Sequence, residues 1–279
     1  MEEENAFKLE KDIEFLHSRF EKILIESEGE SFYHSVKETL KLSRAYREKH
    51  SEQEFQELIR LIEKTPLVDA EKLTRALTVY LTLVNIAEEH HKVRLTRQEN
   101  EGAMAKTFAA LLNADIPQDK LYDTVCNLRI ELVLTAHPTE IMRRSLLQKY
   151  TNISLALQIR DYADVPLFER EQNDATISRE IYGIWQTDAI RKKQPTPTDE
   201  AYGGLLIFEQ TLWNEMPRYL RELSLALKEA TGRTLPLDAA PMRFASWMGG
   251  DRDGNPNVTE AVMRRAMARQ SKAALDYYL

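Results

Sequence analysis

The stretch that decides the fold reads Leu132-Val133-Leu134-Thr135-Ala136-His137-Pro138-Thr139-Glu140. Its apolar, partly β-branched start predicts a short strand, and a histidine and a proline follow at once. The proline disfavours helical backbone for the preceding residue, so His137 is expected to be extended at the strand's C-terminal end. Thr139 can then cap a helix that begins at Glu140. The stretch therefore predicts an imidazole placed where parallel strands commonly present catalytic groups.

His137 has two interpretations on this evidence. An imidazole, whose ordinary pKa is about 6.5, can move protons at neutral pH. A buried histidine with a purely structural role fits the pattern as well. The adjacent His90 and His91 point in different directions on a helix and cannot form an i, i+4 metal pair. Structural roles are also expected for the remaining histidines, which lie among charged surface patterns: His17, His34 and His50.

A second non-helical region spans residues 242–259. Residues 242–248 predict another short strand, and a last helix is expected from Thr259 and Glu260 to the C-terminus. Three of the chain's nine glycines lie between them, at Gly249, Gly250 and Gly254. The charged residues Asp251, Arg252 and Asp253 lie in the same loop. The order of strand, loop and helix start repeats the layout around His137.

The chemistry of this second loop is open on sequence alone. Residues 251–255 resemble the start of a calcium-binding loop, but Pro256 stands where glycine is needed and Val262 where glutamate is needed. A phosphate-binding loop would continue with Gly-Lys-Ser/Thr, which is absent from the sequence. The plain interpretation is a tight turn whose aspartates cap the next helix. The repeated layout favours a functional loop instead.

The remainder of the chain predicts helices. No glycine occurs between Gly29 and Gly102, which suits long packed helices. After a helix around residues 13–23, helices are expected at 32–47, 54–64, 70–97, 102–113, 118–128, 140–162, 168–190 and, after a cap at Thr196, from 197 to about 230. Pro217 predicts a kink or break in the last of these. Around ten helices and two short strands make the fold class mainly α.

A basic group accompanies the first loop. Arg143 and Arg144 follow His137, and Arg191 ends a later helix. Arginine side chains suit bidentate recognition of phosphate or carboxylate. Solvated helix ends are the alternative, because a cation at the end of a helix complements its dipole.

Composition excludes several classes of protein. The chain of 279 residues has 45 acidic and 38 basic residues, so its net charge is −7, which argues against a nucleic-acid-binding or membrane-surface protein. Cys126 is the single cysteine, so no intrachain disulfide or cysteine-based zinc site is expected. The acidic N-terminus is unlike a signal peptide, and no apolar run approaches membrane-spanning length. We expect a cytoplasmic protein.

Three motifs resemble signatures of the phosphoenolpyruvate carboxylase family. Residues 133–140, followed by Arg143 and Arg144, are similar to its first signature. Residues 244–259 are similar to a second, longer one, and Arg191 with residues 194–197 matches a third. The motifs occur in the family's order, and the N-terminal helices resemble the family's as well. The resemblance therefore covers the whole chain.

The resemblance implies an anaplerotic lyase that converts phosphoenolpyruvate and bicarbonate into oxaloacetate and phosphate, with Mg²⁺ or Mn²⁺ as cofactor. Bicarbonate would attack the phosphoryl group, giving carboxyphosphate and the enolate of pyruvate. His137 would take the carboxyl proton, so that carboxyphosphate breaks into phosphate and CO₂, which the enolate attacks. The bicarbonate or CO₂ pocket and its loop would be formed by Trp247, Gly249, Gly250, Asp251 and Arg252. A large apolar ring at Trp247 would help to exclude water.

The resemblance also implies allosteric control and assembly. Arg143, Arg144 and Arg191 match a pocket that binds sugar-phosphate activators in plant-type relatives, and the family's full-length enzyme is a homotetramer. The family is much longer than this chain. Its metal-binding carboxylates, Gly-Arg-Gly-Gly loop, catalytic lysine and most phosphoenolpyruvate-binding arginines follow the part that is matched here.

We therefore expect an N-terminal portion of a bacterial-type enzyme that is inactive alone. Residues 1–128 would form a helical region, and residues 129–279 the first two strands of a helix-rich, TIM-like β/α barrel with their helices. Two strands cannot close a barrel, so exposed apolar surface is expected beside them. Two alternatives remain: a phosphohistidine carrier that uses His137, and an effector-binding or assembly module built on the three arginines.

Overall fold

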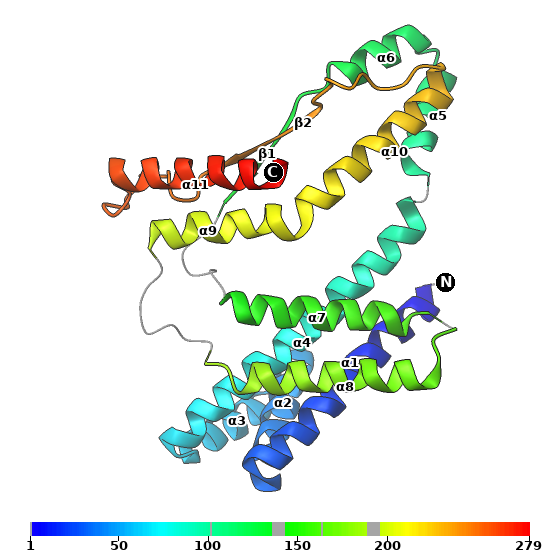
Figure 1. Ribbon diagram of the computed structural model, residues 1–279. Coiled ribbons are helices and arrows are strands. Elements are labelled where there is room, and N and C mark those ends of the chain that lie inside the picture. The colour runs from blue at the N-terminus through cyan, green and yellow to red at the C-terminus, as the bar shows by residue number, and fades with distance from the viewer. Residues whose placement is uncertain (1, 101, 136–142, 163, 189–195) are drawn as a thin grey trace. The chain divides into compact units, whose positions relative to one another are not determined.

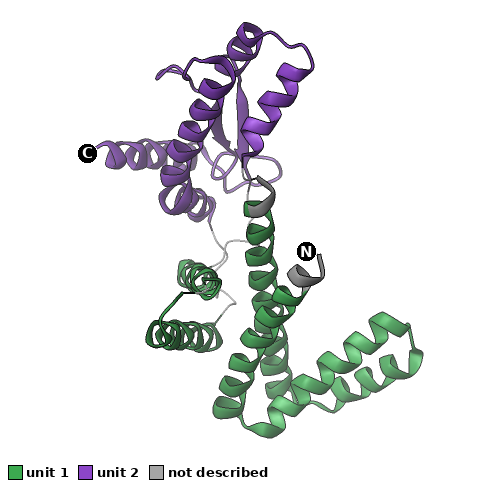
Figure 2. Cartoon of the chain, turned by 90° about the vertical axis from the view of Figure 1, so that its right-hand side faces the viewer, with its two compact units in different colours: residues 1–98, 142–190 green, residues 99–141, 191–279 purple. Residues whose placement is uncertain are grey.

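The computed structural model describes residues 2–100, 102–135, 143–162, 164–188 and 196–279. Over these residues the chain is mainly helical, with two short strands (Figure 1). It divides into two compact units (Figure 2). Unit 1 comprises residues 1–98 and 142–190, and unit 2 comprises residues 99–141 and 191–279. The two units therefore interleave along the chain. The sequence analysis instead divides the family's architecture at residue 128, and that division stays a prediction.

Unit 1 is built from long helices: α1 (Glu2–Glu28), α2 (Glu30–Lys49), α3 (Glu52–Lys64), most of α4 (Leu67–Asn100), α7 (Arg144–Arg160) and α8 (Leu167–Trp185). The long helices predicted from the lack of glycine are confirmed. The predicted end of α8 at residue 190 is wrong. Thr187 closes the last turn of α8. Its hydroxyl donates to the Gly183 carbonyl oxygen at 2.6 Å, and its N–H donates to the Ile184 carbonyl oxygen at 3.1 Å.

The core of unit 1 lies where α1, α4, α7 and α8 meet. Apolar residues at helical spacing face one another, and those that are almost fully buried include Leu16, Phe20, Ala87, Ile153, Leu157, Ile177 and Ile181. The Phe20 ring meets Trp185 edge-on, with 6.0 Å between the ring centroids. Burying one large apolar side chain contributes about 1.5–3 kcal/mol, so this shared core holds α7 and α8 against the N-terminal helices.

A polar network joins helices of the same unit. Arg94 of α4 donates to both carboxylate oxygens of Asp161, at 3.1 and 2.7 Å, and to Asp12 of α1 at 2.8 Å. The ring of His90, whose exposed fraction is 2%, lies 3.0 Å from Asp161 through Nε2. His91 is buried beside it and contacts Arg94. These histidines are structural, as expected from the sequence.

Unit 2 contains both strands. Its elements are α5 (Ala103–Asn113), α6 (Gln118–Cys126), β1 (Ile130–Leu134), α9 (Pro197–Ile207), the π-helical turn η2 (Phe208–Leu212), α10 (Trp213–Thr231), β2 (Met242–Ser246) and α11 (Glu260–Tyr278). Its apolar core joins α5, α6 and α10 through Phe108, Leu121, Val125, Leu223, Ala226 and Leu227. Within the described part of the chain, no helix has the length and apolar character needed to cross a bilayer.

The break predicted at Pro217 lies one turn earlier. Residues 208–212 form the wider π-helical turn, and Pro217 itself lies inside α10. A proline ring clashes with the carbonyl group four residues before it, here that of Trp213. The wider turn ends directly before this carbonyl group, so we attribute the irregularity to the proline. It separates α9 from α10, which run in different directions in Figure 1.

The two strands form a parallel sheet. Ile130 lies opposite Met242, and the register continues to Leu134 opposite Ser246. β2 ends two residues before the prediction, because Trp247 already begins a turn. The side chains of Ile130, Leu132 and Val133 are 42–45% exposed. Parallel sheets are normally covered on both faces, so this exposed apolar surface agrees with the expectation of uncovered strands.

Candidate functional site

The candidate site lies at the C-terminal edge of the sheet. Because β1 and β2 are parallel neighbours, the segments that follow them leave from the same edge. The N–H of Trp247 donates to the carbonyl oxygen of Leu134 at 3.0 Å, which extends the ladder by one rung. The prediction that a short strand precedes each loop is confirmed, whereas the pairing of the two strands was not predicted. His137 itself lies outside the described residues, three positions after Leu134.

The chain turns sharply after β2. The carbonyl oxygen of Trp247 accepts hydrogen bonds from the N–H groups of Gly250, at 3.0 Å, and Asp251, at 2.9 Å. Gly249 has a φ of +74°, and a Cβ atom there would lie 2.9 Å from Ala201 Cβ and 3.1 Å from the Pro197 carbonyl oxygen. Both the backbone conformation and the close approach therefore require glycine. The turn therefore packs closely against the start of α9.

The start of α9 is fixed by a capping box. The side chain of Thr196 accepts from the Asp199 N–H at 3.2 Å, and the Asp199 carboxylate accepts from the Thr196 N–H at 2.8 Å. The cap predicted at Thr196 is confirmed. Further along α9, a Cβ atom on Gly204 would collide with the sulfur of Met248. α9 therefore presents small residues on which the loop after β2 rests.

The charged part of this loop is organised by its own side chains. Asp251 accepts from the N–H of Asp253 at 3.0 Å, a local turn of the Asx type. The cap of α11 is Thr259, whose hydroxyl oxygen accepts from the Val262 N–H at 3.4 Å. The interpretation that the aspartates cap the next helix is therefore wrong, whereas Thr259 begins that helix as expected.

Three of the predicted site residues face solvent. The side chain of Trp247 is 60% exposed, and Asp251 and Arg252 are exposed as well. Arg252 reaches α11, where it donates to the sulfur of Met263 at 3.1 Å. The loop thus presents an indole ring, a carboxylate and a guanidinium group beside the strand edge. The guanidinium group of Arg252 could bind a small anion, but the pocket assigned to these residues stays a prediction.

Glu200 was not singled out from the sequence. It lies in the first turn of α9, where an acidic residue is explained by the helix dipole. In the structure it is 8% exposed, one helical turn before the buried Gly204 on the same face of α9. Burial raises the pKa of its carboxyl group, and the nearby Asp199 raises it further. Only the tertiary packing of α9 distinguishes Glu200 from an ordinary surface glutamate.

The predicted effector arginines begin α7 in unit 1. Arg143 is the half-buried N-cap residue in an extended conformation, and Arg144 is the exposed first helical residue. Arg191 lies outside the described residues, so convergence of all three stays a prediction. Cations at a helix N-terminus oppose the helix dipole. An anion bound there would interact favourably with the arginines and with the free N–H groups of the helix.

The residues that the structure describes do not fit a metal centre. They contain no cluster of three or more histidine, cysteine, aspartate or glutamate side chains that could hold an ion. Stable divalent-metal sites draw several ligands together, usually carboxylates for Mg²⁺. No chemical step is therefore assigned to a metal held by these residues.

The fold and the loop define a helix-rich α/β protein with polar groups at the C-terminal ends of parallel strands, the edge at which α/β enzymes bind ligands. In a comparison with known families, residues 9–279 match the family described as "Phosphoenolpyruvate carboxylase". The chain belongs to the phosphoenolpyruvate carboxylase family, as its motifs indicated.

Similar proteins carry the same name. The chain is 48% identical over 214 residues to phosphoenolpyruvate carboxylase 2 of Chlamydomonas reinhardtii, covering 76% of this chain and 18% of the relative. It is 38% identical over 278 residues to the Acinetobacter baumannii enzyme, covering 97% and 31%. Phosphoenolpyruvate carboxylase 4 of Arabidopsis thaliana is 40% identical over 289 residues, covering 99% and 28%. The chain thus spans less than a third of the length of these relatives.

Proposed function

We propose that this chain is part of an enzyme that carboxylates phosphoenolpyruvate with bicarbonate, giving oxaloacetate and phosphate. Its family supports the reaction class. The observation that carries the proposal is the hydrogen bond between Trp247 and Leu134, because it joins the C-terminal ends of the two strands, from which the two signature loops leave. A reaction that needs a base from one loop and a substrate pocket from the other requires this proximity.

In the proposed reaction, an oxygen of bicarbonate attacks the phosphorus of phosphoenolpyruvate. The phosphoryl group passes to bicarbonate, giving carboxyphosphate, and the enolate of pyruvate leaves. His137 removes the carboxyl proton, and the C–O bond to phosphate then breaks, releasing CO₂ and phosphate. The enolate carbon attacks CO₂ to form oxaloacetate. The indole of Trp247 would cover CO₂, and the turn from Gly249 to Arg252 would line the pocket. Exclusion of water is essential, because water would protonate the enolate.

We propose further that β1 and β2 are the first two strands of a TIM-like barrel, which the remainder of a longer protein completes. The exposed apolar side chains of β1 support this proposal. So does an apolar cavity of about 320 Å³ beside the C-terminal ends of the strands, whose walls include Leu134, Phe208 and Phe244. Isolated parallel pairs are unstable, so further strands and helices would stabilise both surfaces.

The regulatory proposal is that Arg143, Arg144 and Arg191 bind a sugar phosphate. Its support is the placement of two of these arginines at the start of α7, where their charge opposes the helix dipole. Calorimetry with sugar phosphates, comparing the parent protein with Arg144→Ala, tests it. Unchanged heat and affinity in the variant would reject this assignment.

Cofactor and assembly follow from the same family. We propose that Mg²⁺ or Mn²⁺ is held by residues outside this chain, that the full enzyme is a cytoplasmic homotetramer, and that the 279-residue chain alone does not form oxaloacetate. Coupling the purified chain to malate dehydrogenase measures this last point. Oxaloacetate formation by the chain itself would contradict it.

The role of His137 is tested in the full-length protein. His137→Asn removes the base while keeping a polar side chain of similar size, so carboxylation should fall by about 10²–10⁴-fold. His34→Asn, at an exposed histidine of α2, is the matched control. Retained carboxylation in His137→Asn would remove this histidine from the mechanism. Transfer of ³²P from phosphoenolpyruvate to His137 would instead favour a phosphohistidine carrier.

A further inference from the structure

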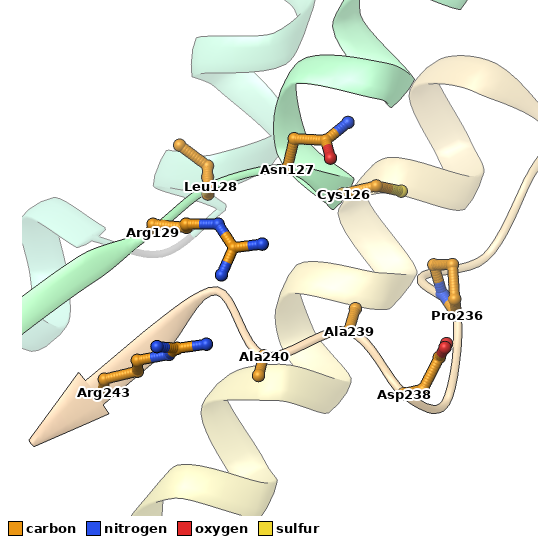
Figure 3. Close-up of a pocket in the computed structure, with 9 residues that line it drawn as sticks. All are labelled: Cys126, Asn127, Leu128, Arg129, Pro236, Asp238, Ala239, Ala240 and Arg243. Carbon is orange, nitrogen blue, oxygen red and sulfur yellow. The ribbon is translucent and has the colours of Figure 1, made fainter.

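A polar cavity of about 250 Å³ lies at the opposite, N-terminal end of the strand pair (Figure 3). The chain enters β1 along one wall, and the loop before β2 forms the other. The residues around the cavity are Cys126, Asn127, Leu128, Arg129, Pro236, Asp238, Ala239, Ala240 and Arg243. The proposed carboxylation uses none of these residues.

The sheet register holds two arginines together. Arg129 directly precedes β1, and the next residue, Ile130, donates its N–H to the Pro241 carbonyl oxygen at 2.8 Å. Arg243 is the second residue of β2 and lies opposite Glu131. Side chains alternate along a strand, so residues 129 and 131 share the face of residue 243. Figure 3 shows both guanidinium groups extending from neighbouring strands into the cavity.

Among the described residues, none forms a hydrogen bond or an ion pair with the guanidinium group of Arg129 or of Arg243. Glu131 shares their face but forms no ion pair with them within the described part of the chain. Arg233 of the same unit behaves differently: it pairs with Asp119 at 2.7 Å and lies over the ring of Tyr122. Like charges on adjacent strands repel each other.

We propose that Arg129 and Arg243 form a binding site for a small anion with a carboxylate or phosphate group. Two guanidinium groups can each donate two parallel hydrogen bonds to such a group, which an ammonium group cannot do. The cavity, of about 250 Å³, is large enough for a small molecule. Asp238 adds a negative charge to the wall, so the ligand carries one anionic group rather than several.

The test uses the 279-residue chain and two probes, inorganic phosphate and acetate, titrated at constant ionic strength. The NMR signals of the Arg129 and Arg243 Nε–H groups should shift along a saturating curve. Arg129→Gln and Arg243→Gln should each weaken binding about tenfold, the loss expected for a charge-assisted hydrogen bond. Tighter binding of phosphate or of acetate identifies which anionic group the site prefers.

Arg221→Gln is the matched control, because Arg221 is an exposed arginine of α10 that lies away from the cavity. It should bind both anions as the parent chain does. Shifts that stay linear with concentration, or equal affinity in the parent chain and both cavity variants, would overturn the proposal. This result would leave the carboxylation proposal untouched, since that concerns the other end of the strands.

Folding is checked separately. Replacing one of two facing cations removes repulsion, so each glutamine variant should unfold at no lower temperature than the parent chain. Arg129→Lys keeps the charge but loses the planar fork, and should bind with intermediate affinity. Phosphate should raise the unfolding temperature of the parent chain more than that of either glutamine variant. An equal rise in all three would also contradict the site.

Discussion

The N–H of Trp247 donates to the carbonyl oxygen of Leu134 across 3.0 Å, one residue beyond the end of β2. This bond fixes where the second loop begins relative to the first strand. A shift of one residue in the register would turn every side chain of β2 to the opposite face. The relative placement of the two signature loops therefore depends on backbone hydrogen bonding as much as on the loop residues themselves.

Gly249→Ala should destabilise unit 2. The substitution combines an unfavourable positive φ with contacts of 2.9 Å to Ala201 Cβ and 3.1 Å to the Pro197 carbonyl oxygen. Overpacking and backbone strain of this kind cost about 1–3 kcal/mol each. Urea unfolding of the 279-residue chain measures the effect on the free energy of unfolding.

Two other glycines separate the causes. Gly254 has a φ of +65° and open space around it, so Gly254→Ala reports backbone strain alone. Gly203 lies inside α9 with nothing within 4 Å of a Cβ atom, and Gly203→Ala should be neutral or slightly stabilising. If Gly249→Ala is as stable as Gly203→Ala, the close packing of the turn is not required.

Thr196→Ala should lower the free energy of unfolding by about 1 kcal/mol. The substitution removes the acceptor for the Asp199 N–H and one half of the capping box. Thr198→Ala, two positions further on, removes no described cap and is the control. Chemical denaturation followed by circular dichroism compares the two variants. Equal stability of both would show that the capping box contributes little to α9.

Arg94→Ala should destabilise unit 1 by about 3 kcal/mol, because it leaves two carboxylates without their cation. The Arg94 side chain is 10% exposed and bridges Asp12 and Asp161. Arg97→Ala is the control, because Arg97 is exposed and makes one long hydrogen bond of 3.4 Å to Gln158. It should change stability by less than about 0.5 kcal/mol. Similar unfolding midpoints for both variants would exclude a stabilising role of the network.

Unit 1 should become less stable as the pH falls below about 6.5. Burial lowers the pKa of His90, although Asp161 acts in the opposite direction. The unfolded chain therefore binds a proton at a higher pH than the folded chain. The contribution of His90 to the free energy of unfolding is fully present above the pKa of the histidine in the unfolded chain. It is lost as the pH falls toward the lower pKa of the histidine in the folded chain. His90 Nδ1 is buried with no acceptor among the described residues, so a proton there gains no hydrogen bond.

His90→Gln should flatten this pH dependence. The free energy of unfolding, measured between pH 5 and pH 8, should vary less in the variant than in the parent chain. Part of the dependence should remain, because burial also lowers the pKa of His17, which packs edge-on against Tyr80. His34→Gln, at an exposed position, should leave the profile unchanged. A parent chain whose stability is constant over this range would contradict the assignment.

Local signals in the sequence were sufficient for most elements. Apolar spacing and the missing glycines predicted the long helices, and Thr196 and Thr259 marked true helix starts. The ends that were missed depend on side chains that compete with the backbone. The hydroxyl of Thr187 closes α8 early, and the ring of Pro217 acts on the turn before it. Neither effect changes the apolar periodicity, so the pattern does not reveal it.

The candidate site divides in the same way. Its residue types and the two loops were readable from the chain, as was the family. The burial of Glu200 and the position of Gly249 against Ala201 were not, because both depend on how α9 packs within unit 2. The paired guanidinium groups of Arg129 and Arg243 were also missed. They are far apart in the sequence, and only the register of the parallel strands makes them neighbours.

By itself, then, the sequence determined the helices, the two strands and the motifs that follow them, since each depends on residues close together in the chain. Only the tertiary structure decided that β1 and β2 pair in parallel, that Trp247 bonds to Leu134, and that α7 and α8 join the N-terminal helices. These relationships arise from hydrogen bonds and apolar burial between distant segments. Local propensity carries no information about which distant partner a segment will meet.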